Sequence, residues 1–230
     1  MRLVRDIPRS AEVNIALEEI LTKRLARGSS PETLRLWVNP PCVVLGRFQR
    51  LKDSVNIEFC RKFKLPVFRR VSGGGTIYQD YGNLNISFYI LKDTLGTKWS
   101  VKESYKLFCG IIVKALKKLG FNASHKPPGD VLVNGKKVSG SAQFRVKNAI
   151  LHHSTLMLKV NLKRLGNVLK IENPEKILAN INLERKKAEK IIIDTALEEL
   201  NVNFEIGNIT NSELKEVNEF LKIKRLLLNF

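Results

Sequence analysis

The chain has 230 residues, enough for one domain with an ample hydrophobic core. It carries 40 Lys and Arg residues against 22 Asp and Glu, and the resulting net charge of +18 points to an anionic partner: a nucleic acid, an acidic protein or a polyanionic small substrate. No apolar run reaches the roughly 20 residues of a membrane span, and the N-terminus has no signal-peptide core. We therefore expect a cytoplasmic protein that makes no membrane contact.

Three cysteines, Cys42, Cys60 and Cys109, lie far apart, each in an apolar segment. This pattern favours buried, reduced thiols over a disulfide or a metal site. The basic residues are spread along the whole chain, and there is no helix-turn-helix or zinc-finger spacing. A nucleic-acid-binding module is therefore a remote interpretation of the charge.

Strand patterns dominate the first part of the chain. Ser10 can cap a first helix that ends at Gly28, and the Asn134-Gly135 pair favours a tight hairpin turn. Helical patterns then take over, so the chain divides into a strand-rich part, 1–160, and a helix-rich part, 161–230. Strands are expected at 34–38, 42–45, 76–78, 84–90, 130–133, 136–138, 149–158 and 203–206, and further helices at 55–64, 100–119, 162–170, 186–200 and 212–222.

A glycine-rich stretch lies between two of these strands. Gly73, Gly74 and Gly75 follow the pair Arg69-Arg70. Glycine lets backbone N–H groups turn inward and form a concavity that binds anions, and two guanidinium groups beside it suit a phosphate or carboxylate. Taken alone, the same glycines are equally typical of a hairpin loop.

A second candidate site follows the hairpin turn. Alternation along the return strand predicts that Lys137, Ser139 and Ser141 share one face, where small residues leave room for a ligand beside the lysine. A surface lysine on an amphipathic strand has the same pattern. Neither common phosphate-binding loop is present: Tyr78 replaces the third glycine of a dinucleotide fingerprint, and Gly135-Lys136-Lys137 lacks the Ser or Thr of a P-loop.

Taken together, these segments resemble the lipoate–protein ligase family. The likeness holds in order and spacing from about residue 10 to 160 and is looser beyond. It is carried by Asn14-x-Ala16-x-Glu18-Glu19, Val43-Val44-Leu45-Gly46-Arg47-x-Gln49, Arg69-Arg70-Val71-Ser72-Gly73-Gly74-Gly75, Asp80, Gly82-Asn83, the segment 135–142 around Lys137, and His152-His153-x-Thr155-Leu156.

The resemblance implies an α/β fold, with a mixed, largely antiparallel sheet flanked by helices as in the catalytic domains of biotin and lipoyl ligases, and one such domain over residues 1–230. It also implies an enzyme that uses ATP and Mg²⁺ to activate lipoate as lipoyl-adenylate. The acyl group then passes to a lysine of an acidic carrier domain of a 2-oxoacid dehydrogenase or glycine-cleavage protein.

Site residues follow from the matched motifs. Lys137 would be catalytic and would touch both the adenylate phosphate and the lipoyl carboxyl. The residues expected to hold ATP are Arg70, Gly75, Thr76, Ile77, Tyr78 and Lys137; those expected to contact lipoate are Arg70, Ser72, Gly73, Gly74, Lys137, Ser139, Gly140 and His152; and those in supporting positions are Arg47, Asp80, Asn83 and Asp130. Because His152 and His153 alternate across a strand, at most one of them faces the pocket, and no metal site is expected.

Four positions depart from the family pattern. Gln79 stands where a His is usual, Ser154 where a Gly is usual, Gly129 where an Asn is usual, and Arg50 where an Asn is usual. These positions would line the acyl pocket or its rim, so the preference between lipoyl and octanoyl chains stays open. Bacterial single-chain ligases also carry an accessory C-terminal domain that this chain lacks, and we expect a separate small partner protein instead, as in some archaeal relatives.

The nearest alternative is an octanoyltransferase of the same superfamily, which moves octanoyl from acyl carrier protein without ATP. Such enzymes use a cysteine nucleophile near the conserved lysine. Here Pro127-Pro128-Gly129-Asp130 precedes the hairpin with no cysteine. A biotin ligase is disfavoured because its Gly-Arg-Gly-Arg type of loop is absent.

Overall fold

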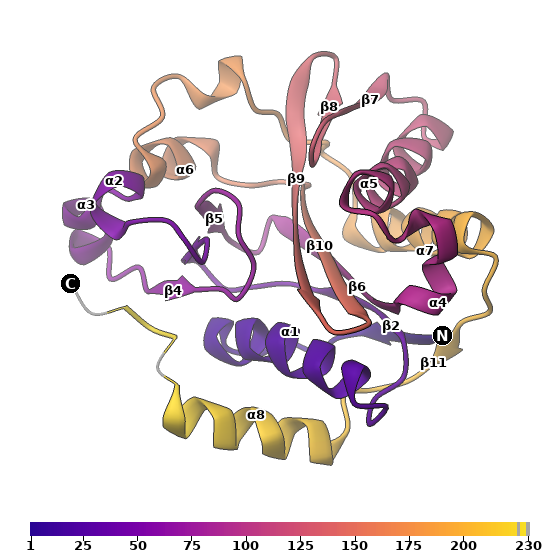
Figure 1. Cartoon of the computed structure of the whole chain (residues 1–230). Coiled ribbons are helices and arrows are strands. Elements are labelled where there is room, and N and C mark those ends of the chain that lie inside the picture. Colours follow the sequence, from indigo (N-terminus) through magenta and orange to yellow (C-terminus); the bar gives the residue numbers. More distant parts are fainter. Residues whose placement is uncertain (225, 229–230) are drawn as a thin grey trace.

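The computed structural model describes residues 1–224 and 226–228, which form two sheets flanked by helices (Figure 1). The large sheet is antiparallel except at one end, where β1 pairs in parallel with both β2 and β11. Its strands, in spatial order, are β11 (Glu205–Ile206), β1 (Arg2–Arg5), β2 (Thr33–Trp37), β6 (Asn83–Leu91), β10 (Ala149–Met157), β9 (Lys136–Val146), β8 (Asp130–Val133) and β7 (Ala123–Lys126). The mixed α/β fold with a largely antiparallel sheet is as predicted.

A small sheet holds the glycine-rich stretch. Its order is β4 (Val67–Arg69), β3 (Cys42–Leu45) and β5 (Ile77–Gln79), with β3 parallel to β4 and antiparallel to β5. The α-helices are α1 (Ala11–Ala26), α2 (Leu51–Ser54), α3 (Ile57–Lys62), α4 (Lys92–Leu95), α5 (Val101–Lys118), α6 (Leu162–Leu169), α7 (Arg185–Leu200) and α8 (Asn211–Ile223), with 3₁₀ turns at Gly96–Trp99 and Pro174–Lys176. Ser10 caps α1 as predicted, since its hydroxyl accepts the Val13 N–H.

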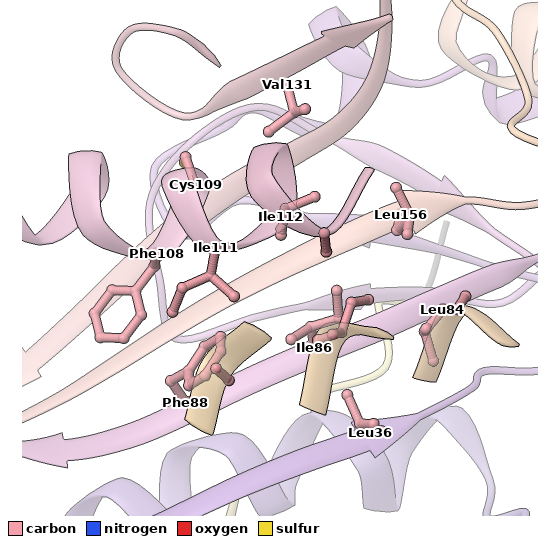
Figure 2. Packing of buried hydrophobic residues seen from close by; sticks show 14 of the residues in the cluster. Leu36, Leu84, Ile86, Phe88, Phe108, Cys109, Ile111, Ile112, Val131 and Leu156 are labelled. Carbon is pink, nitrogen blue, oxygen red and sulfur yellow. The ribbon is translucent and has the colours of Figure 1, made fainter. Parts of the chain in front are cut away.

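In strand β6, apolar and polar residues alternate between the two faces of the sheet. Ile86 and Phe88 point toward α5, and Figure 2 shows them beneath Ile111 and Ile112 of that helix. Burying each such side chain stabilises the fold by about 1.5–3 kcal/mol. The residues that alternate with them, Asn85 and Ser87, face α1 instead and are buried although polar.

Strand β10 pairs with β6 along its whole length and follows the same parity. Ile150 and Leu156 belong to the core beneath α5, whereas Leu151 belongs to the core beneath α1. Parity therefore places His152 on the α5 side and His153 on the α1 side. The His152 ring is fully buried and lies 4.7 Å from the ring of Phe108 in α5.

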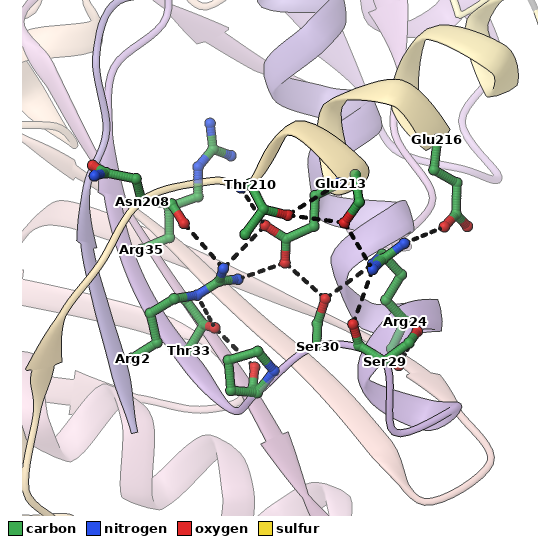
Figure 3. Close-up of polar contacts among 12 residues, drawn as sticks. Arg2, Arg24, Ser29, Ser30, Thr33, Arg35, Asn208, Thr210, Glu213 and Glu216 are labelled. Carbon is green, nitrogen blue, oxygen red and sulfur yellow. Dashed lines mark hydrogen bonds and ion pairs between the residues drawn. The ribbon is translucent and has the colours of Figure 1, made fainter.

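Helix α8 lies beside α1 and is tied to the N-terminal strand through one buried carboxylate (Figure 3). Glu213 accepts two hydrogen bonds from the Arg2 guanidinium, at 2.9 and 3.0 Å, and a third from the Ser30 hydroxyl at 2.7 Å. The same carboxylate completes a capping box with Thr210 at the start of this helix.

The structure adds strands that the sequence patterns did not predict. In β1 only Leu3 and Val4 are buried, between two arginines, and in β7 only Ala123 is buried, so neither strand carries an alternating apolar signal. The return strand β9 runs on to Val146, past Ser141, the last residue that the alternation placed on it. In the described part of the chain, no helix is both long and apolar enough to cross a bilayer.

Candidate active site

A cavity of about 270 Å³ opens between helix α1, the glycine-rich loop and strands β9 and β10. It brings together two segments that lie sixty residues apart in sequence, the stretch from Gly74 to Ile77 and the return strand that carries Lys137. Of the residues predicted for the site, those that line the cavity are Arg70, Gly74, Gly75, Thr76, Ile77, Asp130, Lys137 and Gly140.

The Arg70 guanidinium shapes the glycine-rich loop from behind. Its Nη2 donates to the carbonyls of Gly73 at 2.6 Å and Gly75 at 2.8 Å, and its Nη1 donates to the Val44 carbonyl at 3.2 Å. Burial lowers the pKa of Arg70 to about 10, which still leaves it charged near neutral pH. The arginine therefore occupies the Gly73 and Gly75 carbonyls and fixes the conformation of the loop.

The loop in this conformation leaves main-chain donors free. Within residues 1–224 and 226–228, the N–H groups of Gly74, Gly75 and Thr76 make no hydrogen bond. Gly74 has a φ of +83°, a conformation that favours glycine, and a Cβ placed on Gly46 would lie 2.0 Å from the Gly74 carbonyl oxygen. Consecutive free N–H groups of this kind form an anion-binding concavity.

A β-bulge decides where Lys137 points. Strand β8 pairs Val131 with Ser139 but pairs Leu132 with Lys137, so Val138 is the extra residue on the return strand. The prediction that Lys137, Ser139 and Ser141 share a face is therefore wrong, because it assumed strict alternation. Ser139 lies opposite Leu156 on the α5 side, fully buried and outside the cavity lining.

Lys137 instead lies over Gly140 on the cavity side. A Cβ built on Gly140 would meet Lys137 Cε and Nζ at 3.0 Å, so the missing side chain makes the space that the lysine occupies. Lys137 Nζ pairs with Asp130 Oδ1 at 2.6 Å. The lysine backbone is also held at the sheet edge, since its N–H donates to the Ile177 carbonyl and its carbonyl accepts the Ala179 N–H.

His153, rather than the predicted His152, lines the cavity. Its two ring nitrogens contact Ser72 and Glu18. His152 is enclosed on the opposite face of β10, where it contacts Gln143, and burial is the first cause that lowers its pKa well below the ordinary value. The sequence predicted that at most one of His152 and His153 faces the pocket, but it did not show which of the two does.

The rest of the cavity has an apolar wall and a polar cluster. Apolar side chains come from α1, β2, β3 and β5, namely Ile15, Trp37, Val44 and Ile77. The side chains of the polar cluster hydrogen-bond to one another. Gln79 accepts a hydrogen bond from the Asn39 amide at 2.6 Å and donates to Asn85 at 2.7 Å and to Thr155 at 3.1 Å. Gln79, Ser154 and Gly129, three of the four departures from the family pattern, lie in the lining, whereas Arg50 pairs with Asp53 on the surface.

Other predicted residues support the cavity without lining it. Asp80 and Asn83 close a turn, in which Asn83 Oδ1 accepts the Asp80 N–H and Asp80 Oδ1 accepts the Gly82 N–H, both at 2.8 Å. Arg47 is exposed and stacks on Phe48. The residues predicted to contact ligand that fall outside the lining are Ser72, Gly73, Tyr78, Ser139 and His152.

The sequence also predicts buried, reduced cysteines and no metal site. Cys42, Cys60 and Cys109 are buried and free, as expected, and none of them lines the cavity. Burial raises the pKa of the Cys60 and Cys109 thiols to about 11. Among the residues that the structure describes, no group of three His, Cys, Asp or Glu side chains could hold a metal ion.

Comparison with known proteins finds relatives of two kinds. Lipoate–protein ligase 1 of Staphylococcus aureus is 35% identical over 207 residues, which is 83% of this chain and 61% of that protein. Lipoate-protein ligase LplJ of Bacillus subtilis is 35% identical over 160 residues, 70% of this chain and 46% of that protein. The chain thus spans roughly half the length of these ligases. Octanoyltransferase LipM of Clostridioides difficile is 26% identical over 95% of this chain and 93% of that protein.

Two solved structures share the fold. The crystal structure of lipoate-protein ligase A bound with ATP has a TM-score of 0.88 at 23% identity and covers 97% of this chain and 94% of that one. The bi-partite lipoate protein ligase with its E2 lipoyl domain from Thermoplasma acidophilum has a TM-score of 0.84 at 22% identity, again over 97% and 94%. The lipoyl protein ligase A/B catalytic domain family matches residues 10–191. With most of its length inside that match, this chain belongs to the lipoyl protein ligase A/B catalytic domain family.

Proposed function

We propose that this protein is an ATP-dependent lipoate–protein ligase. The observation that carries the proposal is the meeting of Lys137 and the free N–H groups of Gly74, Gly75 and Thr76 around one cavity with an apolar wall. A cation and preorganised donors suit phosphate and carboxylate oxygens, and the wall of Ile15, Trp37, Val44 and Ile77 suits an acyl chain.

The reaction would proceed in two steps. In the first, a carboxylate oxygen of lipoate bonds to the α-phosphorus of ATP while the bond from that phosphorus to the bridging oxygen breaks, giving lipoyl-adenylate and pyrophosphate. In the second, the amine of a carrier lysine attacks the acyl carbonyl, AMP leaves and one proton is released. No side-chain nucleophile is needed, because the adenylate is already an activated acyl donor.

The protein's contribution is electrostatic and positional. Carboxylate and phosphate repel one another, and the Lys137 ammonium with the loop N–H groups would offset that repulsion at the reacting oxygens. Asp130 holds the ammonium at the cavity before substrate arrives, and the cavity would hold both substrates in line. The Asp130 oxygen that is not paired with Lys137 would be a ligand for a Mg²⁺ ion that accompanies the nucleotide, and the ion would supply positive charge to offset that of the phosphates.

The carrier and a second polypeptide complete the proposal. A net charge of +18 suits an acidic carrier domain, because complementary charge speeds encounter. The Thermoplasma acidophilum ligase, which shares this fold, is described as bi-partite and is accompanied by an E2 lipoyl domain. We therefore propose that full turnover requires a separate small partner protein.

The experiment supplies ATP, Mg²⁺, lipoate and a lipoyl carrier domain, with and without a candidate partner protein, and weighs the carrier by mass spectrometry. The proposal expects an added lipoyl mass that requires ATP and is accompanied by pyrophosphate. Strong turnover by the chain alone would contradict the proposed requirement for a partner protein. Acyl transfer in the absence of ATP would contradict the ligase itself.

An octanoyltransferase is the second candidate, favoured by the nearly full-length match to a LipM enzyme. Transfer from a thioester by that route needs a reactive thiolate. The Cys109 thiol lies 3.5 Å from the hydroxyl of Ser141, a residue of the cavity lining, but it is fully buried and its pKa is raised to about 11. An octanoyl carrier-protein thioester offered without ATP separates the two functions.

A further inference from the structure

An unbroken chain of hydrogen bonds joins Arg70 to a carboxylate on helix α1. Arg70 Nε donates to Ser72 Oγ at 2.9 Å, Ser72 Oγ lies 2.7 Å from His153 Nε2, and His153 Nδ1 lies 2.7 Å from Glu18 Oε2. The other oxygen of Glu18 accepts the Ser87 hydroxyl at 2.8 Å. Four residues from distant segments are thus linked in one line.

Counting hydrogens fixes the direction of this line. Ser72 has a single hydroxyl hydrogen, and the Arg70 N–H already occupies one acceptor position on its oxygen. Within the described chain, His153 Nε2 is the only acceptor in reach of that hydrogen. With that hydrogen donated to Nε2, the ring carries a proton on Nδ1 pointing at Glu18, and every donor points from the arginine toward the glutamate.

The two ends of the line carry opposite charges in a dry region. The exposed fractions of Arg70 and Glu18 are 6% and 3%. A buried charge with no counter-charge destabilises a fold, so the charges of Arg70 and Glu18 each reduce the free-energy cost of burying the other. Burial by itself would raise the pKa of Glu18, but His153 and Ser87 outweigh it and hold that pKa below its usual range.

Arg70 has little freedom left in this arrangement. Its bonds to Ser72, Val44, Gly73 and Gly75 use four of its five N–H groups. The bond at Nε sets the rotation of the guanidinium plane, and the two bonds at Nη2 then set the loop carbonyls. A tilt of the plane would release those carbonyls.

We propose that Glu18 is a positioning residue of the ligase: through His153 and Ser72 it fixes the Arg70 guanidinium, which in turn keeps the N–H groups of the glycine-rich loop turned toward the nucleotide phosphates. The inference rests on the proposed function for its kinetic consequence, but the relay itself is a property of the ligand-free protein.

The order serine, histidine, carboxylate also occurs in hydrolases, where the serine is a nucleophile. Two observations oppose that role here. Ser72 is 1% exposed and is not part of the cavity lining, and its oxygen receives an N–H from a cation, which lowers its nucleophilicity. An acylated peptide that contains Ser72, found by mass spectrometry after turnover, would overturn the assignment of this relay as structural support.

The first test needs no substrate. Nitrogen-15 NMR of the histidine rings should show a proton on His153 Nδ1 and Nε2 as a hydrogen-bond acceptor, and the Arg70 Nε–H should exchange slowly with water. Glu18→Gln and Ser72→Ala should each speed that exchange. An imidazolium or an Nε2–H tautomer, or an exchange rate unchanged in both variants, would overturn the relay whatever the enzyme does.

The second test is kinetic. Glu18→Gln keeps the shape of the side chain and removes its charge, so we expect kcat/KM for ATP to fall roughly ten- to a hundredfold, with KM for ATP raised. The double variant that combines Glu18→Gln with Ser72→Ala should lose no more kcat/KM than the worse single variant, because both substitutions interrupt the same line of hydrogen bonds. Additive losses would contradict the relay.

Glu19→Gln is the matched control. It is the next residue on α1 and is also buried, but its carboxylate pairs with Lys23 and Lys224 and takes no part in the Arg70–Ser72–His153–Glu18 line. This variant should keep wild-type KM and kcat. If the wild-type protein, supplied with carrier and partner, releases no pyrophosphate while the NMR result holds, the proposed function fails and the relay stands.

Discussion

Lys137 Nζ lies 2.6 Å from Asp130 Oδ1, and the two side chains remain 37% and 34% exposed. The pair is therefore held at the cavity without being closed off from an incoming anion. Lys137→Ala should lower ATP-dependent pyrophosphate release by roughly 10²–10³-fold, because the charge opposite the reacting oxygens is lost. A carrier-lipoylation assay measures it. Lys136→Ala is the control: that neighbouring lysine is exposed, its ammonium donates to the Glu175 carbonyl, and its loss should leave the rate unchanged.

Gly140 offers a test of position rather than charge. Gly140→Ala would place a methyl group 3.0 Å from Lys137 Cε and Nζ, and the flexible lysine end would move while the backbone stays. We expect activity to fall by up to roughly 100-fold with the melting temperature nearly unchanged, since a misplaced catalytic group is costly.

Gly110→Ala is the matched control for that substitution. Gly110 lies inside α5, and no atom lies within 4 Å of the place where its Cβ would be built. This variant should keep full activity and gain roughly 0.5–1 kcal/mol in free energy of unfolding, because alanine is the better helix former. Equal activity of the two alanine variants would contradict the role given to the space above Gly140.

The buried thiols predict resistance to alkylation. Cys60 and Cys109 have pKa values raised to about 11, and the pKa of Cys42 is raised further, so at pH 7.5 each is protonated and shielded. Treatment with iodoacetamide should leave carrier lipoylation at its untreated rate, with mass spectrometry confirming unmodified cysteines. Rapid inactivation that coincides with one modified cysteine would favour the octanoyltransferase instead.

The carboxylate of Glu213 predicts an acid-labile helix α8. Burial would raise its pKa above 4.5, but the bonds from Arg2, Thr210 and Ser30 hold it lower. Because the unfolded chain then takes up the proton more readily, this stabilisation is complete above pH 4.5 and is lost as pH falls through the folded pKa. Glu213→Gln should cost about 1.5–3 kcal/mol at pH 7 and flatten this acid limb in denaturant titrations.

Glu216 on the same helix provides the comparison. Its partner Arg27 is half exposed, and the Glu216 side chain itself is 28% exposed, although its second partner, Arg24, is largely buried. Glu216→Gln should change the free energy of unfolding by no more than about 1 kcal/mol. If the two glutamine variants were equally destabilised, the buried link to Arg2 would not be what holds α8.

Much of the architecture could be predicted from local patterns. The helix that Ser10 caps, the hairpin at Asn134-Gly135 and the alternation in β6 are each encoded by residues close in sequence. The strands that were missed, β1 and β7, bury too few apolar residues to show a period and exist because neighbouring strands offer hydrogen bonds.

The sequence predicted which segments form the candidate site, but not on which face of its strand each side chain lies. Motifs located Arg70, the glycines and Lys137, and the structure does gather them around one cavity. The face of Lys137 depends on a bulge at Val138, which is a property of the pairing with β8 and leaves no mark in a single strand. Glu18 was visible only as one letter of a motif on the first helix, because its partner His153 lies 135 residues away.

The even and odd positions of β6 and β10 have a practical meaning for redesign. One set, which includes Ile86 and Phe88, meets α5; the other, with Asn85 and His153, borders the reaction chamber. Laboratory evolution of acyl preference can therefore vary the odd positions that line the cavity, Asn85 and Thr155, and leave the hydrophobic layer under α5 untouched. Other odd positions, such as Tyr89 and Leu151, belong to the core beneath α1 and are kept unchanged.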